Sequence, residues 1–233
     1  FMGWGADTQF LFTSTIEDQD ILVPGVVLDS DRGSYRLGSD WMMFSDEFSS
    51  LDVQVQHCLR TDGREEITGA ASFKDLLVIF TDVSMYVVLG SSALDFQPRK
   101  IDGSTGCTSH WSIVQANDLL YWMARDGVYA FNGSKVEKVS VGIDQLWSGQ
   151  SRSGFVPEAF RAASESLGWP FKIDRTSLAS VNSVHFAERS LIMWSIPIKG
   201  RNAKLLQATL VHDYKHGGFY FWSMPDFTET DRV

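Results

Sequence analysis

Acidic residues at short spacings are the first groups in this chain that could do chemistry, because carboxylates bind calcium and act as general acids and bases. One cluster, Asp29-Ser30-Asp31-Arg32-Gly33 followed by Asp40, has the beginning of a calcium-binding loop. It lacks an oxygen ligand and a glycine at the required places, and no bidentate glutamate closes it. The pattern therefore favours a solvated turn over a calcium site.

Neighbouring carboxylates also occur as Asp18 with Asp20 and as Glu65 with Glu66. Such a pair could serve a glycosidase only if folding set two carboxyl groups about 5–9 Å apart across a cleft. The sequence has no Gly-x-Ser-x-Gly nucleophile elbow and no Gly-x-x-x-x-Gly-Lys-Ser/Thr phosphate loop. We therefore expect a protein that is not an enzyme and has no cofactor.

The metal-binding residue types are few. We interpret each of the five histidines as a strand or turn residue and propose no metal site. The two cysteines, Cys58 and Cys107, have no Cys-x-x-Cys spacing and cannot form a disulfide framework. We expect two buried thiols in a protein made in reducing cytosol.

Composition narrows the classes of partner. The 233 residues carry a formal net charge of −9 and are 44% hydrophobic, enough for a large core. The basic residues are scattered, which disfavours a nucleic-acid-binding face but would let DNA slide past. Apolar runs such as Leu76 to Phe80 are far shorter than the ~20 residues of a membrane-spanning helix. No charged-then-apolar leader opens the sequence, and we treat both ends as potential cut points of a longer polypeptide.

The elements that would position these residues show an internal repeat. The segment Lys74-Asp75-Leu76-Leu77-Val78-Ile79-Phe80 matches Asn117-Asp118-Leu119-Leu120-Tyr121-Trp122-Met123 at an offset of 43 positions. The same offset aligns Tyr86 with Tyr129 and Gly90 with Gly133. A period of this length is typical of one supersecondary unit.

Each unit is predicted to contain four short strands, because β-branched and aromatic residues are enriched in it. The ranges are 67–73, 76–81, 84–89 and 95–101, then 111–116, 119–124, 127–131 and 135–140. Asp126-Gly127 and Asn132-Gly133 are expected to supply the positive φ angles of tight hairpins. Pro98 in one fourth strand, and Lys135, Glu137 and Lys138 in the other, indicate exposed edges. The fold class is therefore all-β, made of antiparallel four-stranded blades and β-propeller-like, with closure left open to residues outside this chain.

A third unit follows after an insertion. Leu191-Ile192-Met193-Trp194 aligns with Leu119-Leu120-Tyr121-Trp122 at an offset of 72, which exceeds the repeat by 29 positions. We predict a helix of about ten residues in the insertion, beginning near Pro157 and stopping before Gly168. The organisation is an irregular β region with room for one blade (1–66), two repeated blades (67–140), a helical insertion (141–182) and a further blade (183–233).

Aromatic residues divide between core and contact. Trp122 and Trp194 occupy matching strand positions and are predicted to lie in the core. Trp147 and Trp169 flank the insertion, where packing within the insertion competes with anchoring a partner. The inserted helix packs either on the chain's own flank or on a neighbouring subunit. The candidate subunit contacts are Phe155, Phe160, Trp169 and Phe171.

The blade motifs resemble a known group of proteins. They are Trp41-Met42-Met43-Phe44-Ser45-Asp46, Ile67-Thr68-Gly69-Ala70, Leu77-Val78-Ile79-Phe80 with Ser84-Met85-Tyr86-Val87-Val88, and Ala124-Arg125-Asp126-Gly127-Val128-Tyr129-Ala130-Phe131-Asn132-Gly133. Together they resemble propeller-containing tail and neck proteins of tailed bacteriophages, including the nozzle proteins of short-tailed phages. The resemblance covers residues 35–145 and, more weakly, 183–223.

The resemblance implies a ring-forming virion component, often sixfold, around the DNA exit channel. Its partners would be further copies of itself and other tail or portal and adaptor proteins, with genomic DNA passing through the lumen. It implies a place in the virion tail or neck after synthesis in the host cytoplasm. The alternative is a carbohydrate-binding or carbohydrate-cleaving propeller at the phage tip, which the aromatic content and the spare carboxylates favour.

Overall fold

The computed structural model describes eleven segments of the chain. These are residues 2–4, 8–12, 15–17, 27–29, 34–36, 40–44, 58–61, 65–90, 95–148, 173–199 and 205–222. The chain forms two compact units, Phe1–Cys107 and Thr108–Val233. The first repeated blade belongs to the first unit, and the second repeated blade belongs to the second unit.

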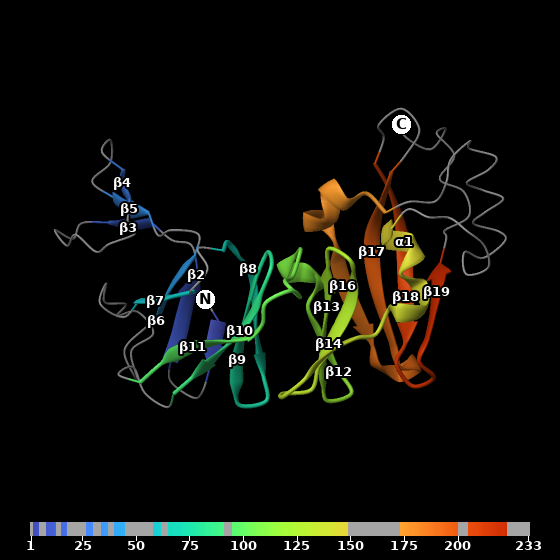
Figure 1. Ribbon diagram of the computed structural model, residues 1–233, viewed down its shortest axis with the longest axis horizontal. Helices are drawn as coiled ribbons and strands as arrows, with labels where there is room; N and C mark the ends of the chain where they lie inside the picture. Colours follow the sequence, from blue (N-terminus) through green and yellow to red (C-terminus); the bar gives the residue numbers. More distant parts are fainter. Residues whose placement is uncertain are drawn as a thin grey trace. The chain divides into compact units, whose positions relative to one another are not determined.

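The first unit begins with two small antiparallel sheets (Figure 1). The four-stranded sheet has the order β1-β2-β6-β7 and contains β1 (Met2–Trp4), β2 (Thr8–Phe12), β6 (Trp41–Phe44) and β7 (Cys58–Arg60). The three-stranded sheet has the order β3-β5-β4 and contains β3 (Thr15–Glu17), β4 (Val27–Asp29) and β5 (Ser34–Arg36). The region expected to hold one blade therefore does contain a four-stranded sheet.

The first repeated blade is a four-stranded meander, as predicted. It consists of β8 (Ile67–Phe73), β9 (Leu76–Thr81), β10 (Met85–Leu89) and β11 (Gln97–Asp102), each antiparallel to the next. Pro98 lies in β11, which has no neighbour on its other side within the sheet. This edge position suits proline, because a proline nitrogen cannot donate to a ladder.

Two further meanders make up the second unit (Figure 1, green and orange to red). The second blade contains β12 (Val114–Ala116), β13 (Leu119–Ala124), β14 (Gly127–Phe131) and β15 (Val136–Lys138). The third contains β16 (Asn182–Phe186), β17 (Leu191–Lys199), β18 (Leu205–Asp213) and β19 (Gly218–Trp222). The prediction of an all-β protein built from antiparallel four-stranded blades is confirmed.

Helical structure is short in the described segments. It comprises the 3-10 turns η1 (His110–Ser112), η2 (Val141–Ile143), η3 (Arg175–Ser180) and η4 (Ala187–Arg189), and the helix α1 (Gln145–Ser148). The ten-residue helix predicted from Pro157 lies outside the described residues. Among the helices that are described, none has the length and apolar content needed to cross a membrane.

The 43-position repeat extends to the backbone angles. β9 and β13 have the same burial pattern, with one half-buried residue followed by five buried ones. Lys74 and the aligned Asn117 both have positive φ, of 53° and 48°, in the turn before these strands. Gly90 and the aligned Gly133 also have positive φ, of 128° and 106°. The repeat therefore preserves the two turn conformations that L-residues rarely adopt.

The hairpin predicted at Asp126-Gly127 is present, but the positive φ angles expected for it were wrong. Gly127 closes the β13–β14 hairpin opposite Ala124, but neither it nor Asp126 is among the described residues with positive φ. Instead, a Cβ on Gly127 would lie 2.4 Å from Ser140 Oγ and 2.5 Å from Lys138 Cε. A side chain at this position would require Ser140 and Lys138 to move, which favours glycine.

The first residues of the strand predicted at 111–116 form the turn η1 instead. Ser112 Oγ donates to the Ser109 carbonyl (2.7 Å) and accepts from the Met123 amide (3.2 Å). A serine hydroxyl that bonds to nearby backbone groups competes with the strand ladder.

Each unit has its own apolar core. In the first, Met42 and Phe44 from β6 pack on Leu77 and Ile79 from β9, together with Tyr86 and Val88 from β10 and with Phe96. In the second, residues of the second blade pack on residues of the third, among them Tyr121, Met123, Ile192, Trp194 and Leu210. Trp122 and Trp194 are both fully buried, which confirms their predicted place in the core.

Candidate functional site

The candidate subunit contacts Phe155, Phe160, Trp169 and Phe171 all lie outside the described residues. Trp147, at the edge of the same insertion, is described and is 2% exposed. It belongs to the core of the second unit together with Ile143 and Leu146. Its ring therefore stabilises its own unit, as the internal-packing alternative expected, and is not offered to a partner.

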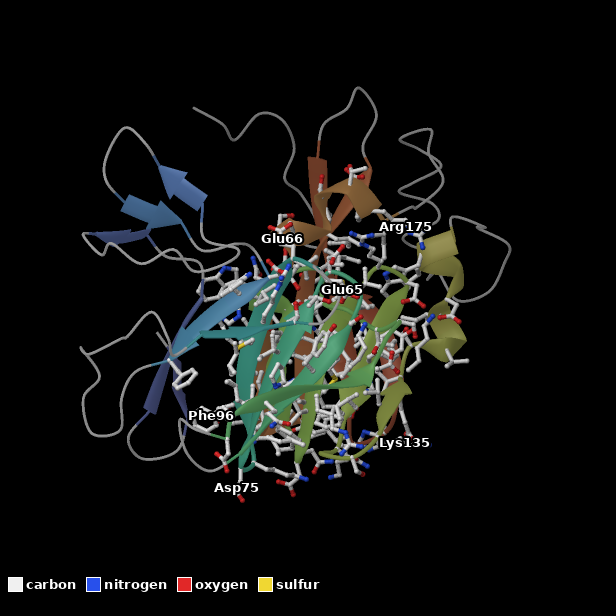
Figure 2. The ribbon with its side chains drawn as sticks, turned by 60° about the vertical axis from the view of Figure 1, so that its left-hand side comes forward. Glu65, Glu66, Asp75, Phe96, Lys135 and Arg175 are labelled. Carbon is white, nitrogen blue, oxygen red and sulfur yellow. The ribbon has the colours of Figure 1, made fainter. Side chains whose placement is uncertain are left out.

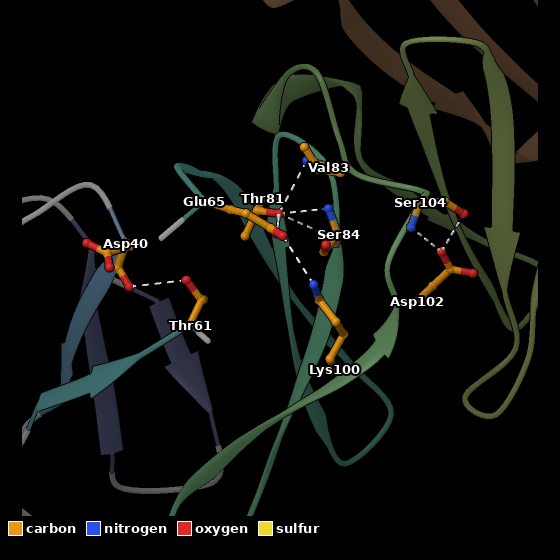
Figure 3. Close-up of polar contacts among 9 residues, drawn as sticks. All are labelled: Asp40, Thr61, Glu65, Thr81, Val83, Ser84, Lys100, Asp102 and Ser104. Atoms are coloured by element: carbon orange, nitrogen blue, oxygen red, sulfur yellow. Dashed lines mark hydrogen bonds and ion pairs between the residues drawn. The ribbon is translucent and has the colours of Figure 1, made fainter. Parts of the chain in front are cut away.

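A cluster of polar side chains surrounds Glu65, just before β8 in the first unit (Figure 3). Thr81 Oγ1 donates to Glu65 Oε2 (2.6 Å), and Lys100 Nζ donates to Oε1 (3.1 Å). Thr81 ends β9, and its hydroxyl also accepts from the backbone N–H of Ser84 (2.7 Å) and, more weakly, of Val83 (3.3 Å). The carboxylate thus ties the entry of β8 to the β9–β10 turn and to the edge strand β11.

Neighbouring groups hold both ionised partners in their charged forms. Partial burial by itself raises the pKa of Glu65, but the hydrogen bonds from Thr81 and Lys100, the nearby Ser84 hydroxyl and the lysine charge outweigh it, so the pKa lies below the ordinary 4.5. Burial alone would lower the pKa of Lys100, yet Glu65 and Tyr86 raise it above 10.5. Lys100 Nζ also lies 5.3 Å from the centroid of the Tyr86 ring, within cation–π range.

A hydroxyl, an amine, a phenol and a carboxylate gathered in one place are the groups that nucleophilic catalysis uses. The geometry disfavours that use here. Ser84 and Tyr86 are each 0% exposed, so a substrate atom has no path to the serine oxygen. Figure 2 places Glu65 and Asp75 at opposite ends of the β8–β11 sheet, so Asp75 is not a partner for this cluster. The arrangement is best suited to holding strands together.

The second blade contains a similar arrangement. Lys138 Nζ forms ion pairs with Asp126 (3.0 Å) and Asp144 (2.9 Å) and lies 5.8 Å from the centroid of the Tyr129 ring. Tyr129 Oη donates to Asp126 Oδ2 (2.9 Å). In the ladders Tyr86 is paired with Lys100 and Tyr129 with Lys138. We call this combination of third-strand tyrosine, edge-strand lysine and carboxylate the tyrosine–lysine clamp.

Sequence reasoning missed the clamps although it had aligned the two tyrosines. Lys100 and Lys138 are 38 positions apart instead of 43, so the offset that aligns the other residues does not align them. Cross-strand pairing brings each lysine opposite its tyrosine. The connection between the third and fourth strands is longer in the first blade, where Leu89 pairs with Gln97, than in the second, where Phe131 pairs with Val136. The available signal was a lysine in each fourth strand: Lys138 had been interpreted only as an edge residue, and Lys100 had not been singled out.

Asp40, the distant member of the weak calcium pattern, has another role in the structure. Its Oδ2 accepts from Arg60 Nε (2.6 Å), and its carbonyl accepts from the Thr61 amide (3.1 Å). The side chain is 12% exposed, and the Arg60 guanidinium lies 5.6 Å from the centroid of the Trp41 ring. The carboxylate is therefore used in joining β6 to β7. Within the part of the chain that is described, no three His, Cys, Asp or Glu side chains are grouped as metal ligands would be.

Two histidines are spaced four positions apart, as metal ligands on a helix often are, a spacing that our interpretation of the sequence had passed over. His212 lies in β18 and His216 in the following turn, and each has its own partner. His212 Nδ1 bonds to the Gly218 carbonyl (3.2 Å), and His216 Nδ1 pairs with Asp213 Oδ2 (2.7 Å).

The buried thiol predicted at Cys107 is present, and that residue is 0% exposed.

Trp111, in the turn η1, is 71% exposed, the largest exposed fraction among the large hydrophobic residues described. Its turn is nevertheless held firmly. Ser183 Oγ donates to the Trp111 carbonyl (2.9 Å), and Trp194 Nε1 donates to the Ser112 carbonyl (3.0 Å). The exposed ring is thus presented by a fixed backbone instead of a loose loop. Because aromatic residues are enriched at interface cores, Trp111 is a candidate contact for a ligand or a neighbouring protein.

Comparisons with known proteins add little to this geometry. No protein-family model and no curated protein matches the sequence. Among solved structures, the crystal structure of the tricorn protease is similar with a TM-score of 0.39 and 10% identity, over 95% of this chain and 18% of that chain. The present chain thus spans less than a fifth of that protein, and a likeness this weak carries no argument. The class is defined by the sheets themselves: an all-β, β-propeller-like protein.

Proposed function

We propose that this chain is a non-enzymatic structural protein of a tailed-phage virion, a ring-forming tail, nozzle or neck component around the DNA channel. The observation that carries the proposal is the combination of internally clamped blades with the exposed Trp111 on a fixed turn. Clamped blades make a stiff wall, and a fixed aromatic side chain supplies a contact between subunits. The blade motifs that resemble phage tail and neck proteins supply the virion context.

Charge supports the same role. The net charge of −9 disfavours tight binding to DNA, because phosphate neutralisation requires clustered Lys and Arg. A channel through which DNA must slide benefits from weak attraction. The partners proposed are further copies of this chain and other tail or portal and adaptor proteins.

Electron microscopy and mass measurement of the purified protein test this proposal. We expect rings. Trp111→Ser should raise the subunit concentration needed for assembly at least tenfold, because a single aromatic anchor often contributes roughly 2 kcal/mol or more to an interface. The melting temperature should change little, because the ring is 71% exposed. The matched control is Val141→Ser, at an exposed apolar position on η2. A strictly monomeric protein that is absent from virions would refute the proposal.

The exposed Trp111 also supports a second candidate function, a carbohydrate-binding propeller at the phage tip, because aromatic faces stack on sugar rings. A glycan array and a hydrolysis assay on host polysaccharide separate the two candidates. Binding of a glycan that Trp111→Ser abolishes, in a protein that forms no rings, would favour the second.

A further inference from the structure

The second and third blades, which together form the second unit, share a core that is almost wholly apolar. Tyr121 and Met123 of β13 face Ile192 and Trp194 of β17 and Leu210 of β18. The buried histidine His212 of β18 lies beside this core, in contact with Tyr121, and is only 5% exposed. It is paired in the ladders with Ile192 on one side and Phe219 on the other.

The His212 ring lies between aromatic rings of the two blades. It is stacked on Phe219 of its own blade, with centroids 4.3 Å apart and planes inclined by 19°. It is tilted by 59° against Tyr121 of the second blade, at 5.8 Å. The contact with Tyr121 crosses the joint between the blades. A change in the charge of His212 would therefore act at that joint.

The tautomer of His212 follows from its hydrogen bond. Nδ1 lies 3.2 Å from the Gly218 carbonyl oxygen. Because a carbonyl can only accept, Nδ1 carries the hydrogen, and Nε2 holds the lone pair in the neutral ring. A second proton would be taken up at Nε2.

The other titratable groups near the joint already have partners. His185 Nε2 of β16 is 3.1 Å from Tyr214 Oη. Asp213, next to His212, pairs with His216 and accepts from the amides of Lys215 and His216 (3.0 Å each). Tyr121 of β13 has its pKa raised, by burial first and then by Tyr214, so it is neutral in this range. The carboxylate closest in sequence to His212 is thus engaged in the turn.

We propose that His212 makes the joint between the second and third blades acid-sensitive, because a proton added at Nε2 places a charge between Tyr121 and Phe219 in a desolvated core. The consequence is a local opening in acid, in which β13 and β18 lose part of their ladder hydrogen bonding.

The direction of the pH dependence follows from the environment. Burial lowers the pKa of His212 below the ordinary 6.5 and outweighs the Gly218 carbonyl and Asp213, which both raise it. The folded protein therefore favours the neutral ring, whereas the unfolded chain takes up the proton at its ordinary pKa. Stability is complete above that ordinary value and declines as the pH falls through it towards the folded pKa. The unfolding equilibrium constant rises by at most about tenfold per pH unit in this window.

His212→Asn tests the proposal, because the asparagine amide can still donate to the Gly218 carbonyl but cannot gain a proton. Amide hydrogen exchange is followed in β13 and β18 between about pH 7.5 and pH 5, after correction for the intrinsic rate. The wild type should lose protection in these strands several-fold more than the variant does. The control His216→Asn alters a histidine whose side chain is 72% exposed and should keep the wild-type response.

Two results would overturn the proposal: wild-type protection in β13 and β18 that does not change with pH, or a His212→Asn variant that loses as much as the wild type. If the variant does not fold, the imidazole of His212 is titrated in the wild type by nuclear magnetic resonance. A folded pKa below 6.5 would then support the proposal, and one at or above 6.5 would refute it.

Discussion

At the scale of single residues, the structure assigns its polar side chains to holding strands together. Glu65 is the clearest case, because its two oxygens receive hydrogen bonds from Thr81 and Lys100, which lie on different strands. Asp126 has the same role for Tyr129 and Lys138 in the second blade. Partly exposed ion pairs of this kind each contribute modestly, about 0–1 kcal/mol. Their value lies in fixing edge strands that have a neighbour on one side only.

Replacing Lys100 by Met should lower the free energy of unfolding by about 0.2–1 kcal/mol at neutral pH, because the side chain is 38% exposed. The loss should shrink in acid. The pKa of Glu65 lies below 4.5 in the folded protein, so its contribution is present above that value and disappears as the pH falls through the folded pKa. Urea denaturation at about pH 7 and pH 3 measures both effects.

Lys135→Met is the matched control for this prediction. Lys135 pairs with Glu137, but the two side chains are 69% and 61% exposed, so the substitution should leave stability nearly unchanged. Equal losses for Lys100→Met and Lys135→Met, or a loss at Lys100 that is independent of pH, would contradict the clamp.

At the scale of elements, close backbone approaches determine how a blade ends. The first blade ends where the segment after β11 returns beside the β9–β10 turn. The Cys107 amide donates to the Thr81 carbonyl (2.9 Å), and Thr68 Oγ1 donates to the Cys107 carbonyl (2.7 Å). Gly106 lies at this return, and a Cβ there would be 2.4 Å from both Asp82 C and Val83 N. Backbone atoms cannot yield as a flexible side chain can.

Gly106→Ala should therefore destabilise the protein by about 1–3 kcal/mol, the usual cost of overpacking a well-packed site. Gly103→Ala, directly after β11, is the control because the atom nearest to a Cβ there, Lys100 Cδ, is 4.0 Å away. Its effect should stay within about 0.5 kcal/mol. Thermal and chemical denaturation of both variants test the pair, and equal stability would show that the segment can move away from Val83.

At the scale of the whole molecule, the question is how subunits would be joined. The insertion is rich in aromatic residues, and Phe155, Phe160, Trp169 and Phe171 remain the candidates predicted from the sequence. A group of several large aromatic rings is favoured in a buried environment, either in the same chain or in a neighbour. Trp147, at the edge of the insertion, finds this environment in its own unit.

Replacing Trp169 and Phe171 together with Ser distinguishes the two possibilities for the insertion. If these rings meet a neighbouring subunit, oligomer mass should fall while circular dichroism and melting temperature stay at the wild-type values, because interface energy is concentrated in a few aromatic anchors. If they pack on their own chain, the melting temperature should drop, and assembly should fail only as far as folding does. A variant with normal mass and normal stability would exclude both roles.

The sequence by itself determined the strands, the repeat and much of the core, because alternation and turn chemistry are local properties that a short window contains. It predicted Pro98 at an edge and Trp122 and Trp194 in the core, and all three are so placed. Only the tertiary structure decided which side chains meet. The pairs of Tyr86 with Lys100 and Tyr129 with Lys138 depend on strand register, which the constant offset of 43 does not encode. The same holds for Gly127, where crowding by Ser140 and Lys138 replaces the expected positive φ, and for His212, whose setting is built by two blades far apart in sequence.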